Sequence, residues 1–137
     1  MAINPLIGLH QAFNAREEDT FRSMLAADVV WHTPGNHPMA GTLTGRDEMW
    51  AQYAARAWES PARIEDHAEL SHPDHSQVAV LFTVVNDFGD GPVRLPGLEV
   101  ARVRDGQIAE RWEFEEDQAL VDRLITRAAE RRASGPG

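Results

Sequence analysis

Two carboxylates in an otherwise apolar stretch are the residues of this chain best suited to proton chemistry. Glu99 and Glu110 lie in two alternating runs separated by Asp105-Gly106. Asp-Gly between such runs is typical of a two-residue type I′ hairpin turn, and the resulting register predicts that Glu99 faces Trp112. Both glutamates then lie on one apolar face, with Cα atoms roughly 7–8 Å apart. Carboxylates in such surroundings are costly unless they are paired, solvated or functional.

The functional interpretation is an acid/base pair. Burial and mutual repulsion would raise one carboxyl pKa toward neutrality, so that one group donates a proton and the other accepts one. The alternative is a face that opens onto water, where one glutamate is simply solvated. His32 is the natural second proton carrier if its ring points inward, and a hydrogen-bonded structural residue if it does not. We therefore predict Glu99, Glu110 and His32 as catalytic residues.

Composition restricts the remaining possibilities. The 137 residues predict one domain over 1–130 and a frayed tail over 131–137. The net charge of −9 argues against nucleic acid as a partner, and the lack of cysteine excludes disulfides and thiolate chemistry. No signal peptide and no apolar run of membrane-spanning length is visible, so we expect a soluble, cytoplasmic protein without a membrane partner.

The pattern of elements predicts an α+β domain in which helices cover an antiparallel sheet. The segment 77–86 is apolar in both phases and predicts a central strand covered on both faces. Because the helices cover only one face, a homodimer is the simplest cover for the other. Helices are predicted over 5–13, 19–25, 46–58 and 118–130, a loop over 36–43, and strands over 29–33, 63–70, 77–86, 97–104 and 107–114.

Two segments, 28–48 and 102–112, resemble the SnoaL-like branch of the nuclear transport factor 2-like superfamily. The first contains Trp31-His32-Thr33-Pro34-Gly35, and the second contains the Asp105-Gly106 turn. The resemblance implies a cone-shaped, curved antiparallel sheet, with three N-terminal helices covering a pocket and a short C-terminal helix. This fold hosts many chemistries, so its presence alone does not define an activity.

The resemblance is selective when it is followed residue by residue. Ketosteroid isomerases carry a catalytic Asp where this chain has Thr33 and a Tyr where it has Leu9, which argues against steroid isomerisation. Epoxide hydrolases of this fold need an Asp-Arg-Asp arrangement in the pocket. The predicted hairpin directs every nearby arginine away from it, and this argues against that activity; the arginines are Arg102, Arg104 and Arg111. SnoaL-like cyclases often have Asp at the position of Glu99.

The sequence thus predicts a cofactor-free acid/base enzyme acting on a small apolar or polycyclic metabolite, by cyclisation, isomerisation or dehydration. A non-catalytic small-molecule-binding protein of the same fold is the alternative. No metal site is expected, because His67, His72 and His75 fit no ligand spacing and lie near an exposed turn. The predicted substrate-binding residues are Phe13, Trp31, Thr33, Met39, Trp50, Tyr53, Trp112 and Phe114.

Overall fold

The computed structural model describes residues 4–135 as an α+β fold built on a six-stranded sheet. The last two residues of the predicted tail lie outside this range, and the final helix extends to Ala133. The helices are α1 Pro5–Ala15, α2 Glu18–Ser23, α3 Arg46–Met49, the π-helical η1 Trp50–Ala54, α4 Ala55–Trp58 and α5 Gln118–Ala133. The strands are β1 Leu25–Thr33, β2 Gly41–Thr44, β3 Arg63–Ser71, β4 Gln77–Asp87, β5 Pro92–Arg104 and β6 Gln107–Glu115.

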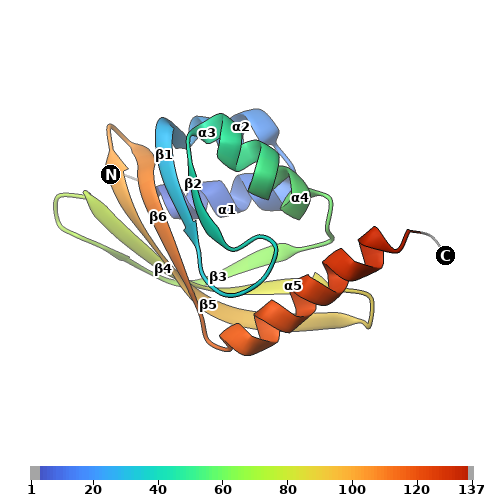
Figure 1. The fold of residues 1–137 in the computed structure, drawn as a ribbon. Helices are drawn as coiled ribbons and strands as arrows, with labels where there is room; N and C mark the ends of the chain where they lie inside the picture. The colour runs from blue at the N-terminus through green and yellow to red at the C-terminus, as the bar shows by residue number, and fades with distance from the viewer. Residues whose placement is uncertain (1–3, 136–137) are drawn as a thin grey trace.

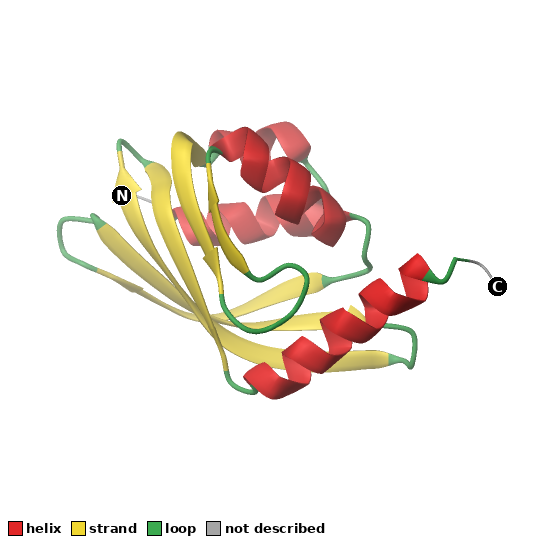
Figure 2. Ribbon diagram, in the orientation of Figure 1, coloured by secondary structure: helices red, strands yellow, loops and turns green. Residues whose placement is uncertain are grey.

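The strongly curved sheet has the order β2-β1-β6-β5-β4-β3. In Figure 1, α1 to α4 pack together inside its curve at one end, while α5 runs diagonally across the other end. Figure 2 shows that the sheet does not close on itself and that the two groups of helices lie at opposite ends of it. Strand β1 runs parallel to β6, and the other pairs are antiparallel, so the sheet is mixed.

Local capping fixes helix α1 where the sequence predicts it. Asn4 accepts a hydrogen bond from the Leu6 amide at 3.0 Å, and Pro5 occupies the first turn. At the other end, the Asn14 side chain donates to the Ile64 carbonyl and accepts from its amide, both at 2.8 Å. These two bonds join α1 to β3 and fix the helix over the concave face of the sheet.

The third predicted helix is interrupted by a π-helical turn. The five residues of η1 lie between α3 and α4, and Tyr53 lies within them. A π-helical turn inserts one extra residue, which rotates the side chains that follow it around the helix axis. The chain before this helix also differs from expectation, since the last three residues of the predicted 36–43 loop belong to strand β2.

The hairpin between β5 and β6 begins as predicted and then changes register. Asp105 and Gly106 have φ of 54° and 76°, as a type I′ turn requires, and Arg104 pairs with Gln107. Ala109 is a β-bulge, because Val103 pairs with Ile108 whereas Arg102 pairs with Glu110. One extra residue reverses the side-chain alternation for the rest of the strand.

The predicted pairing of the two glutamates is therefore wrong. Glu99 faces Glu113 rather than Trp112, and Ala101 faces Arg111 rather than Glu110. The inward residues of β6 are Arg111, Glu113 and Glu115, and the outward ones are Glu110, Trp112 and Phe114.

The hydrophobic core joins α1, α2 and η1 to the concave face of the sheet; its fully buried members include Leu6, Leu25, Val29, Met49, Val80 and Ile108. No helix within residues 4–135 is long and apolar enough to span a membrane.

Candidate functional site

A cavity of about 470 Å³ lies between the concave face of the sheet and the helices. This is a typical size for a small-molecule site. Most of its wall is apolar and comes from α1, β1, β4, η1 and α5; the apolar lining includes Leu9, Phe13, Trp31, Phe82, Val84, Val121 and Ile125. Ionisable side chains gather on one part of the wall, where α1 faces β5 and β6.

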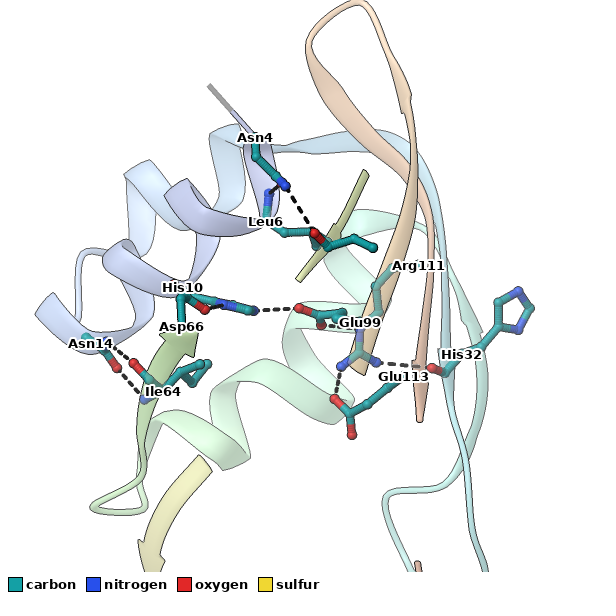
Figure 3. A network of polar contacts seen from close by, with 11 residues as sticks. Asn4, Leu6, His10, Asn14, His32, Ile64, Asp66, Glu99, Arg111 and Glu113 are labelled. Atoms are coloured by element: carbon teal, nitrogen blue, oxygen red, sulfur yellow. Dashed lines mark hydrogen bonds and ion pairs between the residues drawn. The ribbon is translucent and has the colours of Figure 1, made fainter. Parts of the chain in front are cut away.

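His10 is held between two carboxylates. Its Nδ1 lies 2.5 Å from Asp66 Oδ1 on β3, and its Nε2 lies 2.5 Å from Glu99 Oε1 on β5. A ring with a carboxylate on each nitrogen is best satisfied as the imidazolium, because both nitrogens then donate. Figure 3 shows the ring of His10 directed from α1 toward Glu99.

Arg111 continues this chain of contacts into β6. Its Nε donates to Glu99 Oε2 at 2.5 Å, one terminal nitrogen donates to Glu113, and the other donates to the His32 carbonyl at 3.1 Å. The guanidinium also lies over the Trp31 ring, 4.0 Å from its centroid. The result is one connected network, in the order Asp66, His10, Glu99, Arg111, Glu113 (Figure 3).

The pKa values follow from this arrangement and contradict the expectation for Glu99. Burial by itself favours a neutral Glu99, but the charges of Arg111 and His10 outweigh it and lower the pKa of Glu99 to about 2. Burial also opposes the charge on His10, yet Glu99 and Asp66 raise the His10 pKa to about 9. At neutral pH the cavity therefore contains a carboxylate and an imidazolium in direct contact.

A second carboxyl in this region favours its proton. Burial and the neighbouring negative charge of Glu113 raise the pKa of Glu115 well above its usual range. The inward side of β6 therefore carries Arg111, Glu113 and Glu115 at successive inward positions. We expected a raised carboxyl pKa at Glu99 or Glu110, and the structure has it at Glu115 instead.

The three predicted catalytic residues lie at two different places in the structure. Glu99 lines the cavity, whereas His32 and Glu110 contact each other on the convex face at 2.7 Å. The His32 ring stacks on Trp112 with centroids 5.3 Å apart, and Figure 3 shows it pointing away from the network. Thr33 is buried on the concave side, as parity with His32 predicts.

The predicted substrate-binding residues separate in the same way. Phe13, Trp31, Thr33, Met39 and Tyr53 line the cavity. The other three lie elsewhere: Trp50 packs edge-on against Phe21 and Trp58, while Trp112 and Phe114 lie on the convex face beyond the bulge. Two buried polar atoms in the described residues have no hydrogen-bond partner, Trp31 Nε1 and Thr33 Oγ1, both on cavity-lining residues.

Sequence reasoning missed His10, Asp66, Arg111 and Glu113. His10 carried a signal, since it occupies the apolar side of α1 between Leu9 and Phe13 and cannot be buried there without partners. Arg111 was expected to point away from the pocket; it is 1% exposed and lies inside, because of the bulge two residues earlier. Residues 4–135 contain no group of His, Asp and Glu side chains arranged to hold a metal ion.

The fold encloses one side of a largely apolar cavity, and residues 7–111 match the SnoaL-like domain family. The chain belongs to this family. No curated protein matches it.

Three solved structures illustrate the similarity of fold. A protein of unknown function with a cystatin-like fold from Xanthomonas campestris superposes with a TM-score of 0.79 at 23% identity, over 90% of this chain and 97% of its own. TerC, co-crystallised with polyporic acid, gives 0.76 at 17% identity over 88% and 95%. A proposed polyketide cyclase from Xanthomonas campestris pv. campestris gives 0.67 at 20% identity over 88% and 93%.

Proposed function

We propose that this protein is a cofactor-free acid/base enzyme that acts on a small apolar or polycyclic metabolite, by a cyclisation, isomerisation or dehydration of the polyketide cyclase type. One observation carries the proposal: a cation, His10, and a carboxylate side chain, Glu113, line the same apolar cavity. The structural similarity to a proposed polyketide cyclase supports the substrate class. The chain contains neither lysine nor cysteine, so Schiff-base and thiolate chemistry are not open to it.

The chemistry would begin at a carbon next to a carbonyl group. Glu113 removes the proton from that carbon, and the electron pair of the C–H bond moves to give an enolate. Both N–H groups of the His10 imidazolium already donate to Asp66 and Glu99, so His10 stabilises the developing negative charge on oxygen through its positive charge. The enolate then closes a ring, or takes back a proton at another position and shifts a double bond.

Glu99 has a different role in this scheme from the one expected of it. Both of its oxygens are already bound, one by His10 and the other by Arg111, and its low pKa makes it a poor base. We propose that Glu99 keeps His10 protonated and in position. It is a positioning residue, and Glu113 replaces it as the proton acceptor.

The test uses exchange of a ketone with solvent, which requires no knowledge of the natural substrate. The probe is 2-tetralone in D₂O, and loss of its α-proton signals is followed by ¹H NMR. Wild-type protein should accelerate exchange, and Glu113→Gln should slow the protein-catalysed rate by about 10²–10⁴-fold. Glu116→Gln, an exposed carboxylate just after β6, is the matched control and should exchange like wild type.

Exchange no faster than in buffer, while 2-tetralone still binds, would contradict the enzyme proposal and favour the non-catalytic binding protein. Unchanged exchange in Glu113→Gln would remove Glu113 as the base. Circular dichroism of each variant shows whether its fold is intact.

Arg111 supports a second candidate, epoxide hydrolysis. The sequence argued against it because no arginine was expected in the pocket, but Arg111 lies between two carboxylates, Glu99 and Glu113. In such a site one carboxylate activates water while an acid protonates the epoxide oxygen. Conversion of cyclohexene oxide to its diol, measured by gas chromatography, tests this activity; diol at the buffer rate excludes it.

We also propose that the protein is a homodimer formed through the convex face. Leu81 and Phe114 are 48% and 53% exposed there, and the register places Leu98 between them on the neighbouring strand. A second copy of the chain would cover this apolar patch by two-fold symmetry. Light scattering should give a dimer for wild type and a monomer for Phe114→Asp, with Ala51→Asp at an exposed position of η1, away from the convex face, as control. A wild-type monomer at micromolar concentration would contradict the proposal.

A further inference from the structure

The opening of the cavity carries positive charge that the mechanism does not use. Arg56 at the start of α4's single turn and Arg132 near the end of α5 both line the cavity and are exposed. Figure 1 shows that the end of α4 and the C-terminal end of α5 lie on the same side of the molecule. The chain as a whole has 22 acidic residues and a net charge of −9, so a local group of arginines runs against its overall charge.

Three arginines line this part of the cavity, Arg56, Arg131 and Arg132, and two of them are available to bind a ligand. Arg131 donates to the Phe88 carbonyl at 2.6 Å and pairs with Asp90 at 3.1 Å, so it ties the end of α5 to the β4–β5 loop. Among the residues that the structure describes, neither Arg56 nor Arg132 forms an ion pair. The contacts of Arg131 with Phe88 and Asp90 also hold Arg132, the next residue along α5, beside the opening.

One carboxylate also lines this region and must be counted. Asp87 lies at the end of β4, where one of its oxygens accepts the amides of Gly89 at 2.7 Å and Gly91 at 3.2 Å. Those bonds direct the Asp87 carboxylate to its own loop. It reduces the positive charge at the opening without pairing either free arginine.

The interior of the cavity cannot accept a further anion. Asp66, Glu99 and Glu113 already place three carboxylates against two cations at its polar end. A negatively charged ligand group there would lose its hydration and meet carboxylates that are already paired. An anionic group of a ligand is therefore directed away from the network and toward Arg56 and Arg132.

We propose that the ligand is amphipathic, with an apolar ring system or chain inside the cavity and a carboxylate at the opening, bound by Arg56 and Arg132. The planar guanidinium groups suit a carboxylate, which can accept two parallel hydrogen bonds from each. This inference rests on the proposed function and specifies its substrate class. It also sets the orientation of the substrate, since the end opposite the carboxylate reaches His10 and Glu113.

The experiment compares two ligands that differ only in charge. Anthracene-2-carboxylate and the neutral anthracene-2-carboxamide are titrated into the protein at pH 7.5 by isothermal titration calorimetry. Wild type should bind the carboxylate roughly five- to tenfold more tightly than the amide, an advantage that shrinks in 0.5 M NaCl. Arg56→Gln/Arg132→Gln should bind both ligands equally, with the affinity for the amide unchanged.

Arg123→Gln removes an exposed arginine of α5 that does not line the cavity, and it should keep the preference for the carboxylate. Equal binding of the two ligands by wild type, or an undiminished preference in the double variant, overturns the inference and leaves the proposed function standing. Binding of neither ligand by wild type overturns both, because the cavity would then not receive an apolar body of this size.

Discussion

Glu99→Gln tests the central contact of the site, the ion pair that keeps His10 charged. Glutamine has the shape of the glutamate side chain and can still accept a hydrogen bond, but it carries no charge. Burial would then oppose the imidazolium with only Asp66 to support it. We expect the His10 pKa to fall from about 9 by more than about one unit.

The size of the effect follows from the shift itself. Raising the His10 pKa from 6.5 to about 9 corresponds to about 3 kcal/mol of preference for the charged form in the folded state. The low pKa of Glu99 reflects the same ion pair and is not added to this figure. Because the folded pKa is the higher one, this stabilisation is complete below pH 6.5 and is lost as the pH rises through about 9.

Two measurements check the prediction. NMR titration of the imidazole signals gives the His10 pKa directly, with His10→Gln used to assign the signal among the six histidines. Urea unfolding gives the free energy of unfolding, which should fall by about 1–3 kcal/mol in Glu99→Gln at pH 6, because Asp66 keeps part of the stabilisation, and by less above pH 9. Glu116→Gln is the control. A His10 pKa within about 0.3 units of wild type in Glu99→Gln would refute the reasoning.

Two further variants test the inward side of β5 and β6. Glu115→Gln should raise the free energy of unfolding at pH 8. Burial and Glu113 raise the pKa of Glu115 in the folded protein, so wild type loses stability as the pH rises above the pKa that Glu115 has in the unfolded chain. Equal pH dependence of urea unfolding in variant and wild type would contradict this. Gly97→Ala should destabilise by about 1–3 kcal/mol, since a Cβ there would lie 2.8 Å from both the Phe114 carbonyl and the Phe82 ring; an unchanged melting temperature would show that the strands move apart easily.

The sequence by itself determined the features that depend on neighbouring residues. Asn4 and Pro5 define the start of α1, and Asp105-Gly106 defines the turn between β5 and β6, because cap and turn geometry need only a few adjacent residues. The resemblance of 28–48 and 102–112 to the SnoaL-like family predicted the fold correctly, because it too rests on short stretches of neighbouring residues. The apolar pattern of 77–86 correctly predicted a strand inside the sheet, but β4 lies next to the edge strand β3, so the predicted central position was wrong, and within one chain Leu81 on it is exposed rather than covered.

Only the tertiary structure decided which charged residues meet. The bulge at Ala109 has no signal in the pattern of apolar residues, yet it turns Arg111 and Glu113 inward and Glu110 outward. His10 and Glu99 are 89 positions apart, and no local rule brings them to 2.5 Å. Their pKa values depend on burial and on charges from several elements, which exist only when helix and sheet have packed together.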